Sequence, residues 1–234
     1  MVEEHYSLNT DKKDDMRLLT LFLLGMILLV SCGEDPADIL ANSDDPNEIN
    51  SALYTLGFDT TQAIPKGLEE GAMAPYFSGK DQNGRTIAIS NLIKNGKVVV
   101  FFYRGYWCSI CNRHLAHFQD SLSMITDLGA AIVAITPERA EYAERTILNN
   151  NLDFSVVSDE SLEIMESYGV KYKVNNGGRY QEQIDWKKVN SDNVLPVPAT
   201  YIIDEEGKII KKFFNPDFRA RASVNEIVKT LENI

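Results

Sequence analysis

Two kinds of apolar pattern alternate along the chain and predict strands and helices in turn. Continuous apolar runs of strand length occur at Val98–Phe102 and Ala130–Ile135. A strand that is apolar at every position is typical of a parallel sheet buried on both faces. Each run is followed by apolar residues at helical spacing, from about Ser109 to Gly129 and from Thr136 to about Asn149. The pattern therefore predicts a parallel β-α-β core.

The later part of the chain continues this alternation and ends in an antiparallel hairpin. A strand is expected at Phe154–Val157, followed by a helix that Asp159 caps. Strands at Ala199–Ile203 and Lys208–Phe214 flank a turn, and a capping box at Ser223–Glu226 begins the last helix. This order predicts an α/β fold with a mixed central sheet and helices on both faces.

The most apolar segment lies near the start of the chain and reads LLTLFLLGMILLV over residues 18–30. It is too short to cross a bilayer, which needs about 20 residues, and it fits the apolar core of a secretory signal. Cys32 follows at once, and Leu29-Val30-Ser31-Cys32 resembles the bacterial lipobox, in which the cysteine is lipidated. The alternative is a buried helix with an incidental cysteine. We expect a protein anchored by lipid at the cell envelope, facing the periplasm or the surface.

The predicted signal also sets the domain organisation. The residues before Met16 hold five acidic and two basic side chains, whereas signal peptides begin with positive charge, which Met16-Arg17 supplies. We therefore expect translation to start at Met16 and residues 1–31 to be an upstream extension and signal peptide. Residues 32–66 are expected to form an acidic tether and an N-terminal helix, which Asp45 caps. Residues 67–234 form the main domain.

Composition narrows the classes of partner. Apolar residues make up 44% of the 234 residues and charged residues 24%, which are values of a globular protein. The formal net charge of -11 has the wrong sign for a nucleic-acid partner. Three cysteines are too few for a scaffold held together by disulfides.

Two of these cysteines, Cys108 and Cys111, follow the most apolar strand and stand at the start of a helix. The positive end of a helix stabilises a thiolate, which is the reactive form of cysteine. Arg104 lies four residues upstream and adds a full positive charge. Cysteines three residues apart can also close a disulfide. The spacing therefore predicts a redox pair with Arg104 beside it.

Three other interpretations of this segment compete with the redox pair. His114 and His117 continue the spacing and suggest a zinc site, but nine residues of helix carry the last side chain to the opposite face. A purely structural disulfide across so short a loop stabilises little. Each histidine is better explained by packing or surface exposure than by base catalysis. We expect no metal ion and no organic cofactor.

Several segments together resemble a known family. The strand, loop and helix with Trp107-Cys-x-x-Cys111 resemble the thioredoxin fold. More closely, the chain resembles the peroxiredoxin-like branch of the alkyl hydroperoxide reductase/thiol-specific antioxidant family, from about Gly67 to the C-terminus. The matching pieces are GAMAPYF at 71–77, FYRGYWC at 102–108, FSVVSD at 154–159, PVPATYIID at 196–204 and NPDFRAR at 215–221.

The resemblance implies a thioredoxin-like fold and a hydroperoxide substrate, with a dithiol electron donor such as thioredoxin. Pro198 matches the cis-proline that faces the cysteine pair in such proteins, and Trp107 supports the site. Because residues 170–195 show no clear period and directly precede Pro198, we expect them to cover the site partly, with Trp186 as a packing anchor.

The chain also departs from the family pattern. If Cys111 takes the peroxidatic position, Cys108 stands where threonine is usual and Arg104 where proline is usual. The usual strand arginine is absent from Ala199–Asp204, so Arg104 or one of two late arginines is needed in its place, the candidates being Arg219 and Arg221.

Three functions are consistent with these features. The first is a thiol-dependent peroxide reductase in which one cysteine becomes a sulfenic acid and the other resolves it. The second is a membrane-tethered thiol–disulfide oxidoreductase that acts on proteins, with Cys108 as the exposed nucleophile. The third is a non-catalytic binding module, which requires the cysteine pair to be dispensable.

Overall fold

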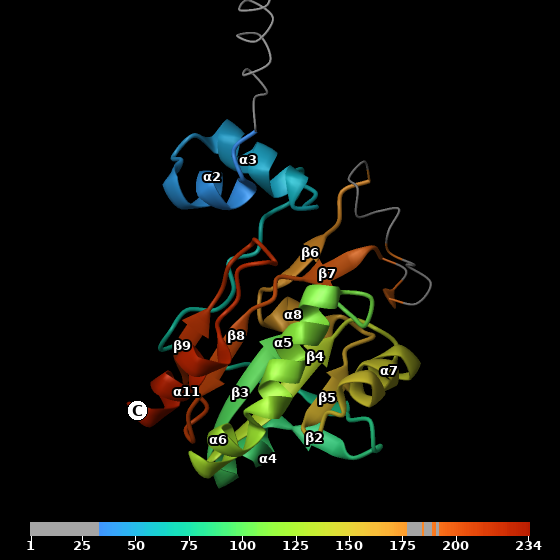
Figure 1. Cartoon of the computed structure of the whole chain (residues 1–234), viewed down its shortest axis with the longest axis vertical. Coiled ribbons are helices and arrows are strands. Elements are labelled where there is room, and N and C mark those ends of the chain that lie inside the picture. Colours follow the sequence, from blue (N-terminus) through green and yellow to red (C-terminus); the bar gives the residue numbers. More distant parts are fainter. Residues whose placement is uncertain (1–32, 177–183, 185–188, 191) are drawn as a thin grey trace, which may run out of the picture. The chain divides into compact units, whose positions relative to one another are not determined.

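The computed structural model describes residues 33–176, 184, 189, 190 and 192–234 (Figure 1). The expected signal peptide, Cys32 and Trp186 lie outside the described residues. The chain divides into two units, residues 1–35 and Pro36–Ile234, and the second unit carries the fold described below.

A five-stranded mixed sheet forms the centre of this unit, in the order β5-β4-β3-β8-β9. The first three of these strands are parallel to one another, and β8 and β9 add an antiparallel edge. This is the sheet that the apolar runs predict. The strands are β3 (Lys97–Phe102), β4 (Ala130–Thr136), β5 (Ser155–Ser158), β8 (Thr200–Ile203) and β9 (Ile209–Phe213).

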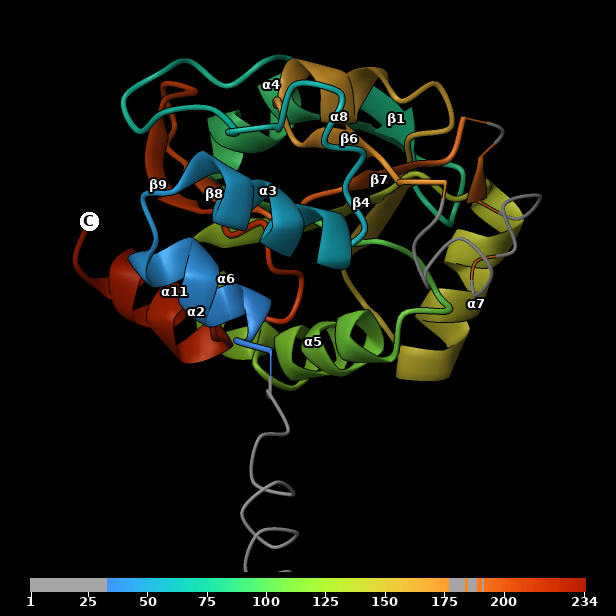
Figure 2. The same ribbon diagram turned by 90° about the horizontal axis from the view of Figure 1, so that it is seen from above.

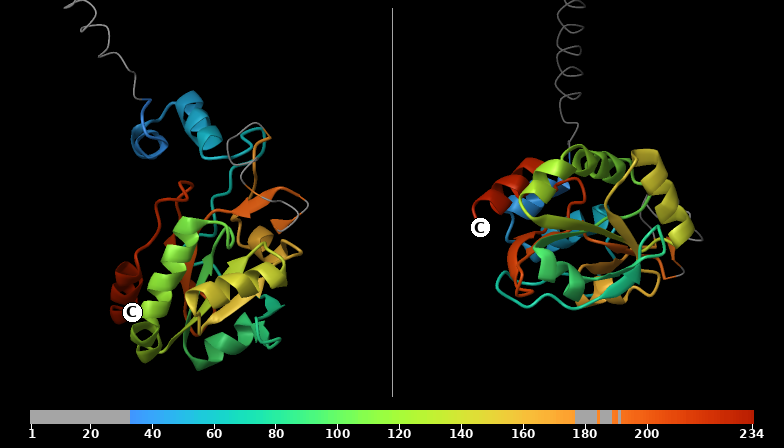
Figure 3. Two further views of the ribbon diagram at one scale, coloured as in Figure 1. Left: turned by 45° about the vertical axis from the view of Figure 1, so that its right-hand side comes forward. Right: turned by 90° about the horizontal axis from the view of Figure 1, so that it is seen from below.

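Helices cover both faces of the sheet (Figure 2 and Figure 3). Alternate residues of β3 enter two separate apolar clusters, because side chains of a strand point to opposite faces. Val99 and Phe101 pack with the helices α5 (Ser109–Asp120), α6 (Leu122–Asp127), α7 (Ala140–Asn150) and α11 (Val224–Glu232). Val98 and Val100 pack with α4 (Ile89–Leu92), η1 (Ile93–Asn95) and α8 (Glu163–Ser167).

Two short helices precede the sheet. The segment expected to be a tether contains α2 (Pro36–Asn42), and α3 (Pro46–Thr55) follows it. The side chain of Asp45 accepts a hydrogen bond from the Asn47 N–H at 2.9 Å, as the sequence predicts for this cap. A hydrogen bond joins the end of α3 to a segment far along the chain: Asn175 Nδ2 donates to the Tyr54 carbonyl at 2.7 Å.

Residues 170–195 are more regular than their sequence suggests. They begin with β6 (Lys171–Lys173) and lead into β7 (Val194–Pro196), and these two strands pair antiparallel. Strands therefore form at both ends of a stretch in which the sequence shows no clear period. Tyr172 and Leu195 are buried in a third apolar cluster with Phe58, and this packing stabilises strands that are too short to show a period.

The remaining strands form a small hairpin, β1 (Ser78–Lys80) with β2 (Thr86–Ala88), joined by a turn that contains Asn83-Gly84. Within the described part of the chain, no helix is both long enough and apolar enough to cross a membrane.

Candidate redox site

The cysteine pair occupies the place in the fold that its sequence context predicts. Strand β3 ends at Phe102, a short loop follows, and α5 begins at Ser109. Cys108 is the N-cap of α5, and its Sγ accepts a hydrogen bond from the Cys111 N–H at 3.3 Å. The sulfur of Cys108 therefore lies at the positive end of the helix.

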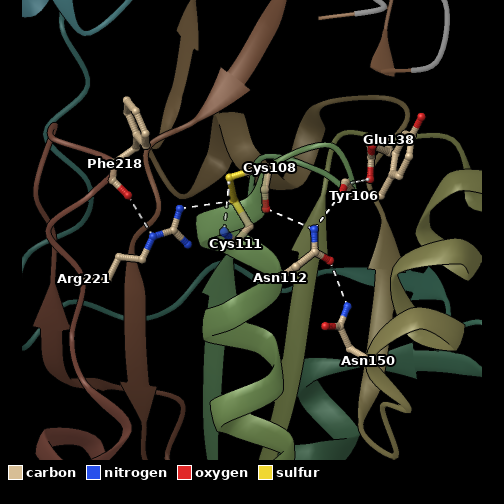
Figure 4. Close-up of a disulfide and its surroundings, with 8 residues drawn as sticks. All are labelled: Tyr106, Cys108, Cys111, Asn112, Glu138, Asn150, Phe218 and Arg221. Carbon is tan, nitrogen blue, oxygen red and sulfur yellow. Dashed lines mark hydrogen bonds between the residues drawn. A yellow bond between two sulfur atoms is a disulfide. The ribbon is translucent and has the colours of Figure 1, made fainter. Parts of the chain in front are cut away.

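Cys108 and Cys111 form a disulfide, with their Cα atoms 5.2 Å apart (Figure 4). Both residues are buried: Cys108 is 5% exposed and Cys111 is fully enclosed at 0%. The small remaining exposure of Cys108 makes it the accessible member of the pair. Cys111 is closed to solvent, so a substrate reaches it only when the surrounding chain moves.

Arg221 provides the positive charge at the disulfide. One of its terminal nitrogens donates to Cys111 Sγ at 3.2 Å, and its Nε donates to the Phe218 carbonyl at 2.9 Å (Figure 4). Burial, together with the charge of Arg104, lowers the pKa of Arg221 to about 10, so this side chain stays cationic at neutral pH. Arg221 is one of the three arginines that the sequence offers in place of the missing strand arginine, and in the fold it contacts the Cys111 sulfur.

The other two candidate arginines take different places. Arg104 is 2% exposed, and its guanidinium carbon lies 4.1 Å from the centre of the Phe218 ring and 4.9 Å from that of Trp107. Such cation–π contacts stabilise a buried guanidinium. Arg219 forms an ion pair with Asp217 at 2.7 Å. The nearby charge of Arg104 still acts on the site through its effect on Arg221.

Pro198 lies beside Arg221 along a groove of about 430 Å³, but its expected cis peptide bond is absent. That prediction is wrong, because no peptide bond among the described residues is cis. The Ala199 N–H donates to the Val197 carbonyl at 2.7 Å, and the Val197 N–H donates to the Val170 carbonyl at 2.8 Å. A three-residue turn around a trans proline satisfies these groups.

The two histidines behave as packing and surface residues. His114 Nε2 lies 2.9 Å from the Ala222 carbonyl, and its ring packs against Phe118. Burial and the charge of Arg221 lower the pKa of His114 to about 4, so it is neutral at pH 7. His117 is exposed. Within the described ranges, no three His, Cys, Asp or Glu side chains gather as a metal site would require.

Three residues that the sequence reasoning missed hold the loop before Cys108. Asn112 Nδ2 donates to the carbonyls of Tyr106 at 2.6 Å and Cys108 at 3.1 Å, and Asn150 Nδ2 donates to Asn112 Oδ1 at 2.8 Å (Figure 4). Glu138 Oε2 accepts from the Tyr106 N–H at 2.9 Å. An asparagine directly after Cys111 is a weak sequence signal, because asparagine is a poor helix former.

Both cysteines and nearly all of the central sheet lie within the match to one family model. The AhpC/TSA family model matches residues 71–212, which is more than half of the chain. The chain belongs to the AhpC/TSA family.

Relatives of this AhpC/TSA member include two types of thiol protein. The chain is 25% identical over 169 residues to the chloroplastic peroxiredoxin Q of Triticum aestivum, covering 71% of this chain and 68% of that protein. It is 26% identical over 163 residues to the thiol-disulfide oxidoreductase ResA of Bacillus subtilis (strain 168), covering 68% of this chain and 76% of the relative.

Among solved structures, the peroxidoxin BcpB from Mycobacterium tuberculosis is similar with a TM-score of 0.57 and 20% identity. The match covers 74% of this chain and 99% of that one. The expected thioredoxin-like α/β fold is confirmed, and the protein is an oxidoreductase of the peroxiredoxin and thioredoxin-like type.

Proposed function

We propose that the protein is a thiol-dependent peroxide reductase in which Cys111 attacks the peroxide and Cys108 resolves the product. The contact of Arg221 with Cys111 Sγ, at 3.2 Å, carries this proposal. A guanidinium at that distance favours the thiolate of Cys111 over its thiol once the disulfide is reduced. Enclosure of Cys111 also selects a small substrate over a protein.

The reaction follows from two thiols and one peroxide. The Cys111 thiolate attacks the terminal oxygen of a hydroperoxide, so an S–O bond forms and the O–O bond breaks. The leaving alkoxide takes a proton and departs as the alcohol, and Cys111 becomes a sulfenic acid. The Cys108 thiol then attacks the Cys111 sulfur, which forms the disulfide and releases water.

An external dithiol completes the cycle. Its thiolate attacks the Cys108–Cys111 disulfide, and its second thiol closes its own disulfide as both cysteines return to thiols. Cys108 is the member that such a donor reaches, because it retains exposure while Cys111 has none. The implied electron donor is a thioredoxin-type protein, as the family relationship suggests.

One observation favours a second function, the exchange of disulfides in other proteins. Cys108 is the N-cap of α5, its sulfur accepts the Cys111 N–H, and it is the more exposed cysteine. These properties suit a nucleophile that attacks bulky disulfides. The similarity to the thiol-disulfide oxidoreductase of Bacillus subtilis supports the same alternative.

We also propose that the protein acts at the cell envelope, attached by lipid at Cys32. The apolar run over residues 18–30 and the lipobox-like residues before Cys32 support this location.

Single-cysteine variants separate the two activities. With Cys108→Ser we expect one reaction with hydrogen peroxide that stops at a sulfenic acid on Cys111, which dimedone traps. With Cys111→Ser we expect no turnover of peroxide. A sulfenic acid found on Cys108 of Cys111→Ser, with none on Cys108→Ser, would overturn the assignment. Mixed disulfides between Cys111→Ser and proteins, without peroxide consumption by the unmodified protein, would establish the second function.

A further inference from the structure

Glu138 is a fully buried carboxyl group that contacts the loop between β3 and α5, residues 103–108, which we call the redox loop. It follows β4, it is 0% exposed, and its Oε2 accepts the Tyr106 N–H at 2.9 Å. Its backbone carbonyl accepts a hydrogen bond from the Ser158 hydroxyl on β5. Its second carboxyl oxygen, Oε1, is buried and has no hydrogen-bond partner among the described residues. A buried acceptor without a donor is costly, so this oxygen calls for an explanation.

A matching donor lies on the same side of Gly105. Trp107 Nε1 is also buried without a hydrogen-bond partner in the described part of the chain. A Cβ atom placed on Gly105 would lie 2.6 Å from Trp107 Nε1 and 2.6 Å from Glu138 Oε1. The two orphaned atoms therefore lie beside the same point, next to Gly105. Glycine at this position leaves the space between them open.

We propose that Glu138 is a positioning residue of the redox loop, whose carboxylate binds the Tyr106 N–H through one oxygen and the Trp107 indole N–H through the other. This proposal rests on the redox function proposed above. Trp107 directly precedes Cys108, so the two bonds fix the turn that presents the Cys108 sulfur at the start of α5. Asn112 holds the carbonyl side of the same turn (Figure 4).

The charge of Glu138 decides the strength of its hydrogen bonds with the Tyr106 N–H and the Trp107 indole N–H. Burial raises the pKa of Glu138 to about 8, so the carboxyl is mainly protonated at neutral pH and ionises in mildly alkaline solution. An ionised carboxylate is about twice as strong an acceptor as a neutral group. The bond to the indole N–H therefore tightens as the pH rises through 8.

Groups from every neighbouring element face Glu138 or the two residues that it binds. None of the described lysines and arginines forms an ion pair with Glu138, and burial and the charge of Glu138 raise the pKa of the neighbouring Tyr103 phenol. The neighbours of Glu138 itself are Tyr103 after β3, the Thr136 hydroxyl on β4 and the Ser158 hydroxyl on β5. Arg104 lies over the Trp107 ring. Tyr142 of α7 stacks on Tyr106, and Arg145 lies over the Tyr142 ring.

The fluorescence of Trp107 should change as its hydrogen bond with Glu138 strengthens. The chain has two tryptophans, so Trp186→Phe leaves Trp107 as the single tryptophan, whose emission is followed. In the disulfide form we expect one fluorescence transition between pH 6 and 10, with its midpoint near pH 8. Adding Glu138→Gln removes a titrating group without changing its shape, and the transition should vanish. The control Glu141→Gln, an exposed acid in the first turn of α7, should leave the transition unchanged.

A second measurement needs no substitution at Glu138. The indole N–H resonance of Trp107, in the Trp186→Phe protein, should move downfield above pH 8. Its protection against exchange with water should increase about fivefold, as a net hydrogen bond of about 1 kcal/mol predicts. The proposal is overturned if this resonance does not respond to pH or if the fluorescence transition persists in Glu138→Gln. Neither readout depends on peroxide turnover, so the role of Glu138 can be confirmed or refuted whether or not the protein reduces peroxide.

Discussion

Replacing Arg221 by glutamine tests the link between structure and chemistry most directly. The substitution removes the cation that lies 3.2 Å from Cys111 Sγ and keeps a polar side chain of moderate length. Two unit charges about 4 Å apart, at an effective dielectric constant of about 20, interact by about 4 kcal/mol. The burial that lowers the pKa of Arg221 offsets part of this attraction.

Hydrogen bonds to charged groups contribute about 1.5–3 kcal/mol after such costs. Each pKa unit corresponds to 1.36 kcal/mol, so we expect the pKa of the Cys111 thiol to rise by roughly one to two units in Arg221→Gln. Below the thiol pKa, the rate of reaction with peroxide follows the thiolate fraction. That rate should therefore fall about tenfold to a hundredfold at low pH and approach the parental rate at high pH.

The assay uses the Cys108→Ser background, in which a single thiol reacts. Stopped-flow measurement of the second-order rate constant with hydrogen peroxide, from pH 4 to 10, gives the thiol pKa in each protein. Arg219→Gln is the matched control, because Arg219 is paired with Asp217 and should change the rate less than about twofold. Identical pH profiles with and without Arg221, or an equal loss in Arg219→Gln, would refute the role of Arg221 in activating the Cys111 thiol.

Three further predictions concern the support of the site and its location. Asn112→Ala leaves the Tyr106 carbonyl without its side-chain donor, so the free energy of unfolding in urea should fall by about 1–3 kcal/mol; an unchanged urea midpoint would contradict the loop-holding role. The pKa of His114 is lowered in the folded protein, so its contribution to stability is present above pH 6.5 and is lost as the pH falls towards 4. His114→Gln should therefore reduce the fall in melting temperature between pH 6.5 and 4. An equal fall in the parent and in His114→Gln would show that His114 does not cause it. Cys32→Ser should leave an unlipidated precursor, and equal release of parent and variant into the soluble fraction would remove the lipid anchor from the proposal.

Local sequence determined the elements and the position of the redox pair. The strands around Val98–Phe102 and Ala130–Ile135 form where continuous apolar runs predict them, because only a doubly covered sheet buries both faces of such a strand. The capping box at Ser223–Glu226 begins α11 as expected, since its bonds join residues three apart. Cys108 and Cys111 meet at a helix start for the same reason, because their positions differ by only three.

Tertiary structure alone decided which charges surround the pair. Arg221 reaches Cys111 across 110 positions of sequence, and only the return of the chain after β9 brings them together. The trans peptide before Pro198 depends on hydrogen bonds of its neighbours, which the sequence does not display. The pairing of β6 with β7 depends on burial against Phe58.

Glu138 shows the physical reason for this division. In the sequence it is one of 34 acidic residues, and no local pattern distinguishes it from an exposed one. Its raised pKa arises from burial beneath the redox loop, which is a property of the packed chain. Hydrogen bonds between near neighbours and apolar periodicity can be predicted from sequence because they act over a few residues. Burial and charge act through space, so they follow only from the fold.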